Sequence, residues 1–227
     1  MAATRFYLPT TGTPPVSPAF DAGWEQTGQA DRITMLPKGT LSTVGSVASN
    51  TITVPITTTQ DLLCRQYVSN PIPPQRITGT VSGVFSPTEA LAAANCKLAV
   101  VVKVVSQDGG TERGTLFSTF STGTEFATTS TTNSRIVPVS AITELTTQPG
   151  DRLVIEVGAN AAAPSSATSY NITFNTNKSS DLALTAGANG TLGNNWFEFS
   201  QDIFGTFLNN FQFVKAPDGI SVSEKIR

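Results

Sequence analysis

The sequence predicts an all-β protein: an antiparallel, jelly-roll-like β-sandwich with one short helix and an extended arm at each end. Short runs rich in Thr, Val, Ile and Phe recur at intervals of roughly ten residues, and turns that contain Gly or Pro separate them. No run alternates with a long helical pattern, which excludes a doubly wound α/β fold. Hydrophobic residues make up 39% of the 227 residues, which is enough for one substantial core.

The clearest strand follows the Pro-Gly turn at residues 149–150. Leu153, Ile155 and Val157 alternate with other residues, so this strand has one apolar face. Arg152 and Glu156 lie on the opposite face, and we expect Glu156 to point outward. A strand with one apolar face must bury that face against a second sheet, which predicts a sandwich.

The remaining elements follow from similar local signals. Residues 9–18 are rich in proline, which has no amide donor and a fixed φ, and this predicts an extended strap outside the sheets. The apolar run 96–105 predicts a central strand covered on both faces, and the Gly109-Gly110 turn predicts a hairpin into 114–118. A Ser-Pro-Thr-Glu helix-start signal predicts one or two helical turns over 86–94. Further strands are predicted at 6–8, 24–27, 32–36, 49–57, 61–68, 76–85, 124–128, 134–139, 151–157, 169–174 and 195–200.

The chain divides into three predicted parts. Residues 1–20 form an N-terminal arm with the first strand, 21–203 form the sandwich, and 204–227 form a Phe-rich C-terminal arm. A cluster of rings beyond the last core strand requires cover, either by the sandwich core or by a partner. We expect 10–18 and 204–227 to contact neighbouring subunits more than their own sandwich. The candidate partner-binding residues are Pro14, Pro15, Phe204, Phe207, Phe211, Phe213, Ile220 and Val222.

Composition excludes several classes of partner. The formal net charge is −2 and the pI is about 5.1, so no basic field exists for nucleic acid. No segment has the length and apolarity of a signal peptide or a membrane span, so we expect no membrane partner. Cys64 and Cys96 form no CxxC motif, which predicts two reduced, buried thiols on neighbouring strands.

Catalytic signals are weak. Without histidine, the chain lacks the commonest general base and the usual zinc ligand, and we assign no catalytic residue, cofactor or metal. Carboxylates remain, and we expect structural roles for them; they are Asp21, Glu25, Asp151, Glu156, Asp181 and Glu198. The Gly-rich stretch 187–193 lacks the lysine of a phosphate-binding loop, so we expect a surface loop.

Aromatic residues leave a second reading open. A sugar-binding module would stack a ring of Trp24, Trp196 or Tyr170 on a sugar. Tryptophans at such positions also commonly cover the ends of a sandwich core. The exposure of the two tryptophans distinguishes these readings.

Several motifs lie along residues 5–200. They are Arg5-Phe6-Tyr7-Leu8-Pro9, Pro15-Val16-Ser17-Pro18, Gly23-Trp24-Glu25, Arg76-Ile77-Thr78-Gly79-Thr80-Val81, the runs 98–105 and 150–158, Arg113-Gly114-Thr115-Leu116, and Trp196-Phe197-Glu198-Phe199-Ser200. In these motifs the chain resembles a group of structural proteins of tailed-bacteriophage particles. The Phe-rich segment after Ser200 is an addition to the shared pattern.

The resemblance implies a non-enzymatic virion protein, made in the cytoplasm of the host bacterium. Its expected role is a decoration or cement protein on the outer surface of the head. The alternatives are a component of the tail or baseplate and a carbohydrate-binding module for host attachment. The implied partners are the major capsid protein or tail proteins, together with further copies of this chain, for which a trimer is favoured.

Overall fold

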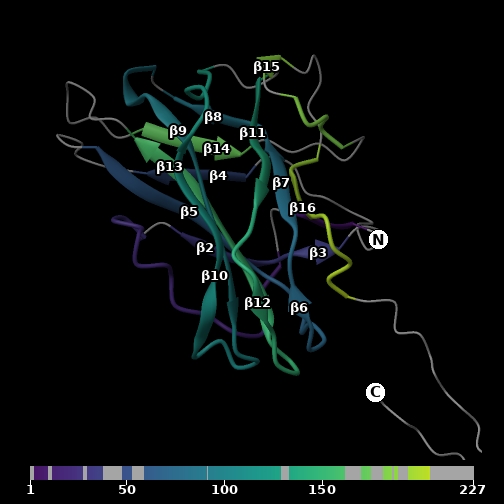
Figure 1. Ribbon diagram of the computed structural model, residues 1–227. Helices are drawn as coiled ribbons and strands as arrows, with labels where there is room; N and C mark the ends of the chain where they lie inside the picture. Colours follow the sequence, from purple (N-terminus) through teal and green to yellow (C-terminus); the bar gives the residue numbers. More distant parts are fainter. Residues whose placement is uncertain are drawn as a thin grey trace, which may run out of the picture.

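Two mainly antiparallel sheets pack face to face in the computed structural model of the chain (Figure 1). The structure describes residues 3–9, 12–27, 30–37, 48–52, 59–90, 92–128, 133–161, 170–174, 181–185, 187–188 and 194–204. Strands dominate the described residues, and the predicted all-β sandwich is confirmed.

Long strands build the five-stranded sheet. Its order is β10 (Glu112–Thr122), β9 (Cys96–Val105), β13 (Arg152–Ala161), β5 (Gln60–Val68) and β2 (Asp31–Thr34). Neighbours are antiparallel except β2 and β5, which are parallel. The predicted hairpin after 96–105 is confirmed, because β9 and β10 pair directly across the turn.

The six-stranded sheet joins the two ends of the described chain. Its order is β15 (Gly187–Ala188), β11 (Asn133–Ala141), β7 (Thr80–Phe85), β16 (Trp196–Phe199), β1 (Thr4–Tyr7) and β3 (Leu36–Pro37). β16 lies between β7 and β1, with Thr4 opposite Phe199.

Two smaller sheets lie at opposite ends of the sandwich (Figure 1). The first contains β4 (Ala48–Ile52), β14 (Tyr170–Phe174) and β8 (Pro87–Glu89), and lies at the upper end in the figure. The second pairs β12 (Leu145–Thr146) with β6 (Arg76–Ile77) at the lower end.

The core lies between the inner faces of the two large sheets. Alternate residues of β9 and β13 enter it, as the period-two pattern predicts. Across from them, the rings of Phe6, Phe197 and Phe199 are fully buried. Phe6 and Phe199 meet edge to face with centroids 6.0 Å apart, a favourable geometry for aromatic pairs.

The predicted helix over 86–94 is wrong. Residues Pro87–Glu89 form strand β8, and only a 3₁₀ turn, Ala92–Ala94, follows it. The Glu89 carboxylate accepts the Cys96 amide at 2.8 Å, and the Glu89 amide donates to the Ala127 carbonyl at 3.0 Å. These contacts use the groups that would have formed a helical cap, and pairing with β14 stabilises the extended form.

The two cysteines are buried thiols, but they do not lie on neighbouring strands. Cys64 is on β5 and Cys96 is on β9, and β13 separates these strands. Burial raises the pKa of the Cys64 thiol to about 12. Period-two patterns identify strands but not their order in a sheet, which explains this error.

The last described residues pack on the sandwich. Ile203 is fully buried, and its amide donates to the Thr4 hydroxyl at 2.8 Å. The Phe204 ring lies 5.7 Å from the Phe6 ring and contacts the main core. Of the predicted C-terminal arm, Phe207, Phe211, Phe213, Ile220 and Val222 lie outside the described residues.

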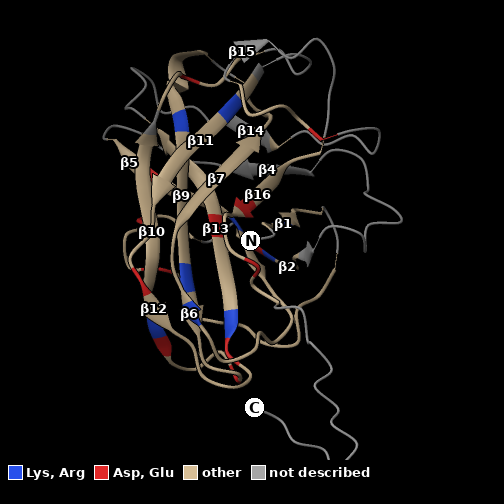
Figure 2. Ribbon diagram, turned by 45° about the vertical axis from the view of Figure 1, so that its right-hand side comes forward, with Lys and Arg blue, Asp and Glu red and all other residues tan. Residues whose placement is uncertain are grey.

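Charge is sparse on the fold. Basic and acidic positions are scattered over both sheets (Figure 2), in keeping with a charged fraction of 13%. In the described parts of the chain, no helix is long and apolar enough to cross a membrane.

A substitution at Gly158 tests the packing between β13 and β5. A Cβ at this position would lie 1.9 Å from the Leu62 carbonyl oxygen and 2.8 Å from the Trp24 ring. We predict that Gly158→Ala lowers the free energy of unfolding by about 2 kcal/mol or more, because backbone must move to relieve the clash. Urea denaturation measures the change.

Gly110→Ala is the matched control, because its Cβ would meet nothing closer than 3.5 Å. It should change the free energy of unfolding by less than about 1 kcal/mol. Equal stability of the two variants would contradict the packing of β13 on β5.

Candidate functional site

Residues 12–27, here called the strap, run across the outer face of the five-stranded sheet. Val16 packs on an apolar patch formed by Val68, Val105 and Val154. Further along, Phe20 and Trp24 cover a second patch, made by Leu63, Ala99 and Val101. The strap therefore buries the face of the sheet that is opposite the main core, and β9 is covered on both faces, as predicted.

The prolines of the strap differ in exposure. Pro14 is buried by the chain itself, whereas Pro15 is exposed. Of these two candidate partner-binding residues, only Pro15 offers its surface to a second molecule. Residues 12–18 lie outside the sheets, as the sequence predicts. The strand predicted at 24–27 is wrong, because the described residues of this segment form only an isolated bridge between Gln26 and Leu62.

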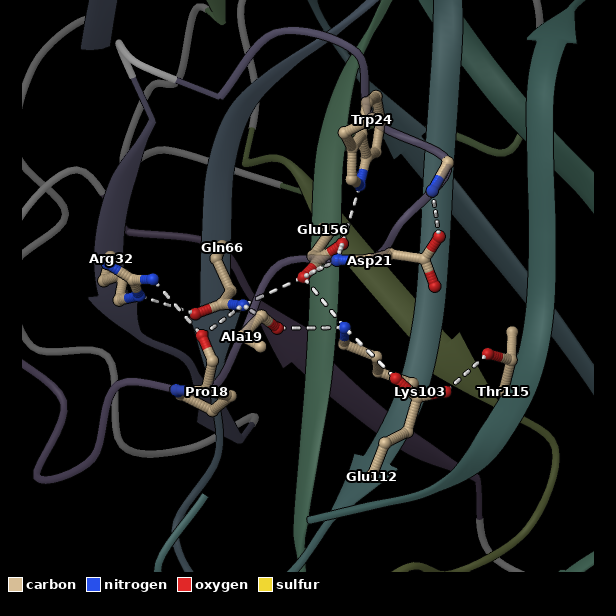
Figure 3. Close-up of polar contacts among 11 residues, drawn as sticks. Pro18, Ala19, Asp21, Trp24, Arg32, Gln66, Lys103, Glu112, Thr115 and Glu156 are labelled. Atoms are coloured by element: carbon tan, nitrogen blue, oxygen red, sulfur yellow. Dashed lines mark hydrogen bonds and ion pairs between the residues drawn. The ribbon is translucent and has the colours of Figure 1, made fainter. Parts of the chain in front are cut away.

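Glu156 is the centre of a polar cluster beneath the strap (Figure 3). Its side chain is fully buried, so the prediction that it points outward to solvent is wrong. It does lie on the face opposite the core, but the strap covers it. The carboxylate accepts hydrogen bonds from the Trp24 indole at 2.6 Å, the Gln66 amide at 2.8 Å and the Asp21 amide at 3.1 Å.

Lys103 supplies the positive charge of this cluster. Its side chain is only 1% exposed, and Nζ donates to the Ala19 carbonyl at 3.0 Å. Nζ also lies 3.4 Å from Glu156 Oε1 on one side and 3.4 Å from Glu112 Oε2 on the other. The Glu112 side chain is 43% exposed, so one partner of Lys103 is buried and the other is solvated.

Gln66 and Arg32 complete the cluster. Gln66 Nε2 is within 3.3 Å of the Pro18 and Ala19 carbonyls, and its Oε1 accepts from Arg32 Nε at 3.0 Å. The Arg32 guanidinium also donates to the Pro18 carbonyl at 3.2 Å and stacks 4.0 Å above the Phe20 ring. Side chains of the sheet therefore bind the Pro18 and Ala19 carbonyls, whereas Gln26, at the end of the strap, bonds to β5 through its backbone.

A second cluster lies on the outer face of the six-stranded sheet. The Arg5 guanidinium is 3.8 Å above the Trp196 ring, with Asp181 at 2.7 Å and Glu198 at 2.9 Å. The Tyr7 hydroxyl donates to Asp181 at 2.8 Å. Burial raises the pKa of Asp181, but hydrogen bonds from Tyr7 and Arg5 outweigh this effect and lower it. Burial, followed by the contact with Asp181, raises the pKa of Tyr7 to about 12.

A third cluster contains two carboxyl groups beside one guanidinium. Glu89 is 1% exposed, and burial and the neighbouring Glu125 raise its pKa to about 7. Arg135 lies against both groups and donates to the Glu125 and Thr124 carbonyl oxygens. Burial lowers the pKa of Arg135, although both carboxyls act in the opposite direction.

The predicted carboxylates fill structural positions. Asp151 accepts from Arg113 at 3.2 Å and from the Gln148 amide at 2.8 Å, which fixes the turn before β13. Glu25 accepts the Asp61 amide at 3.0 Å. Asp21 accepts the Gly23 amide at 2.8 Å. Of the six predicted groups, Asp181 and Glu198 share one partner, Arg5, and the backbone amide of Asp21 donates to Glu156.

Neither tryptophan is exposed enough to stack on a sugar, which removes the main support for a sugar-binding site. Trp24 is 6% exposed and Trp196 is 2% exposed, so neither presents a ring to a ligand. The Tyr170 side chain lies outside the described residues. Within the described residues, no group of three or more acidic or cysteine side chains could hold a metal ion. Of the Gly-rich stretch 187–193, Gly187 and Ala188 form β15, and the rest lies outside the described residues.

Neither a scan against protein-family models nor a search of curated proteins finds a match for this chain. The site must therefore be judged on its geometry. Sequence reasoning missed Lys103, Gln66 and Arg32 as partners of Glu156. One signal could have found the cluster: Lys103 stands alone in the apolar run 98–105, and a lysine in a fully covered strand requires a buried acceptor.

We predict that removing each of the two carboxylates around Lys103 changes the free energy of unfolding by a different amount. Glu156→Ala leaves a buried ammonium without its buried partner and should lower the free energy of unfolding by about 3 to 5 kcal/mol. Glu112→Ala removes the solvated partner at the same distance and should cost less than about 1 kcal/mol. Urea denaturation measures the free energy of unfolding of both variants. Equal decreases would show that the buried contact with Glu156 stabilises the fold no more than the solvated contact with Glu112.

The raised pKa of Glu89 predicts that the stability of the protein depends on pH. Its pKa is about 7 in the folded protein and 4.5 in its ordinary state, so the folded protein holds a proton that the unfolded chain releases. The free energy of unfolding should therefore fall as the pH rises from about 4.5 to about 7. Glu89→Gln stays neutral and should be more stable than the wild type at pH 8 by about 1 to 3 kcal/mol.

The control is Glu144→Gln, an exposed carboxylate paired with Arg76. It should leave the pH profile unchanged. Thermal unfolding measured from pH 4 to pH 8 tests both variants. Parallel profiles for the wild type and Glu89→Gln would contradict a raised pKa at Glu89.

Proposed function

We propose that this chain is a non-enzymatic structural protein of a tailed-bacteriophage particle, bound to the outer surface of the head as a decoration protein. The observation that carries the proposal is the resemblance of residues 5–200 to structural proteins of such particles. The resembling segments overlap β1, β9, β10, β13 and β16, which belong to the two large sheets, together with β6 and the start of β7. The shared pattern is therefore that of a scaffold.

The burial pattern supports a structural role. The strap covers one outer face of the sandwich. On the other outer face, Arg5 stacks on Trp196 and pairs with Asp181 and Glu198. Asp21, Glu25 and Asp151 accept hydrogen bonds that fix loops and the strap. A particle surface exposes its proteins to salt and proteases, and contacts that fix extended segments oppose local opening under such conditions.

The proposed partners are the major capsid protein and further copies of this chain, with a trimer as the favoured assembly. Pro15 offers an exposed ring on the strap. The Phe-rich residues 204–227 supply the remaining apolar candidates for the contact, of which Phe204 packs against the core of its own sandwich.

Particle fractionation tests the proposal. Mass spectrometry of heads and tails, separated from phage whose genome encodes this chain, should detect the protein in the head fraction. Detection in the tail fraction alone would make it a tail or baseplate component. Absence from both fractions would overturn a virion role.

Deletion of residues 216–227 tests the arm. We predict that the truncated protein keeps the thermal midpoint of the full chain within a few degrees and binds purified heads at least ten times more weakly. The physical reason is that the apolar residues Ile220 and Val222 lie beyond the last described contact with the sandwich at Phe204. Sedimentation of heads with labelled protein measures binding.

The control is a chain with Ile220 and Val222 retained and Glu224 and Lys225 exchanged for alanine. It should bind heads like the full chain. Normal binding by the truncated protein would show that the arm is dispensable, and failure of that protein to fold would assign these residues to the core.

A further inference from the structure

Three adjacent strands bring an amine, a carboxylate and a carboxamide together under the strap. Lys103 lies on β9, Glu156 on β13 and Gln66 on β5, and β13 is the middle strand. Each of the three side chains is at most 1% exposed. Figure 3 shows Lys103 and Gln66 converging on Glu156 from opposite sides.

The amine and the carboxamide share two acceptors. Glu156 Oε1 is 2.8 Å from Gln66 Nε2 and 3.4 Å from Lys103 Nζ. The Ala19 carbonyl is 3.3 Å from the same Nε2 and 3.0 Å from the same Nζ. The carboxylate that contacts the amine therefore also contacts the nitrogen of the carboxamide.

The opposite end of the Gln66 carboxamide is also fixed. Its Oε1 accepts a hydrogen bond from Arg32 Nε at 3.0 Å. A cationic donor on this oxygen draws electrons from the carbonyl carbon and would stabilise the negative charge that develops when a nucleophile adds to it. The carboxamide thus has a fixed orientation, with its oxygen on a cation and its nitrogen on an anion.

We propose that Lys103 and Gln66 form an intramolecular isopeptide bond, with Glu156 as the proton carrier and Arg32 as the stabiliser of the oxyanion. The proposal rests on these contacts alone and is independent of the virion role. The bond would link β9 to β5 across β13 and place a covalent cross-link beneath the strap.

The reaction balances without an oxidant or a second substrate. Glu156 takes a proton from Lys103 Nζ, and the neutral amine adds to Gln66 Cδ while Arg32 holds the oxygen. Glu156 then gives that proton to Nε2, the Cδ–Nε2 bond breaks, and ammonia leaves. Nζ still carries one proton more than an amide nitrogen, so Glu156 takes this second proton and passes it to the departing ammonia, which becomes ammonium. The new Nζ–Cδ bond is an amide, and the neutral mass of the protein falls by one ammonia molecule.

Burial favours this reaction in two ways. The fixed strands hold the amine and the carboxamide together, which replaces a bimolecular encounter by an intramolecular one. The strap excludes bulk water, which would otherwise solvate the ammonium and compete as a nucleophile. Neighbouring strands are about 4.8 Å apart, so a lysine and a glutamine that point toward each other can bridge one intervening strand.

The competing acceptor groups are less suitable. Glu112 also lies 3.4 Å from Lys103 Nζ, but its side chain is 43% exposed and its solvated carboxylate is a poor electrophile. Glu156 accepts hydrogen bonds from Trp24, Asp21 and Gln66, and its Oε1 contacts both reacting nitrogens, so it is placed to carry a proton from one to the other. Gln66 is the neutral acyl group of the cluster.

Intact-mass spectrometry of the denatured full-length protein tests the bond. The wild type should weigh one ammonia less than its sequence, after allowance for loss of Met1. Trypsin should release residues 66–76 and 98–113 as one linked peptide that is not cleaved after Lys103. Locating the link is essential, because the Asn189-Gly190 pair can also lose ammonia by cyclising.

Three variants assign the chemistry. Lys103→Arg and Glu156→Gln should have the full mass of their sequences, and their tryptic peptides should be separate. Lys97→Arg makes the same substitution on the same strand, away from the cluster, and should keep the ammonia deficit. The linked wild type should also unfold at a higher temperature than Lys103→Arg.

A wild-type protein that keeps its full mass after prolonged incubation overturns the proposal, whatever the variants do. Loss of water in place of ammonia would assign the acyl group to a glutamate and overturn the role of Gln66. An ammonia deficit that persists in Lys103→Arg would place the loss elsewhere in the chain. Bond formation in Glu156→Gln would overturn the role of Glu156 as proton carrier.

Discussion

The buried carboxylate of Glu156 determines how the rest of the molecule is arranged. A carboxylate without exposed surface is costly unless charge and hydrogen bonds compensate it. Part of that compensation comes from the sheet, through Lys103 and Gln66, and part from the strap, through the Asp21 amide and the Trp24 indole. Both sets contact the same carboxylate, so the buried charge couples docking of the strap to formation of the sheet.

This coupling explains how a proline-rich segment can be an integral part of a β-sandwich. Prolines remove amide donors, so the proline-containing part of the strap, residues 12–18, cannot extend the sheet through a ladder. Its carbonyls bind side chains of the sheet instead, notably Arg32, Gln66 and Lys103. Such contacts are specific to side-chain identity, whereas a backbone ladder would accept many sequences. The polar cluster therefore fixes the position of the strap along the sheet as well as its stability.

Many strands could be predicted from the sequence because apolar residues alternate along a strand that has one face in the core. Leu153, Ile155 and Val157 alternate, and they do enter the main core. The same alternation placed Glu156 on the other face correctly, but periodicity carries no information about what covers that face. The cover comes from residues 12–27, which are more than a hundred positions away in sequence. The error at 86–94 has a similar origin, because distant β14 binds a segment whose local signals favour a helix.

The strap also controls the chemistry that the cluster can perform. Lys103, Gln66 and Glu156 lie on the outer face of the sheet, and they become dry because the strap covers them. Before the strap docks, water solvates the amine and the carboxylate and separates the reacting groups. Bond formation must therefore follow docking, so a covalent link would form only in chains whose strap is already seated. A cross-link made in this order ties β9 to β5 after the fold is complete, and it makes permanent an arrangement that the buried charge first selects.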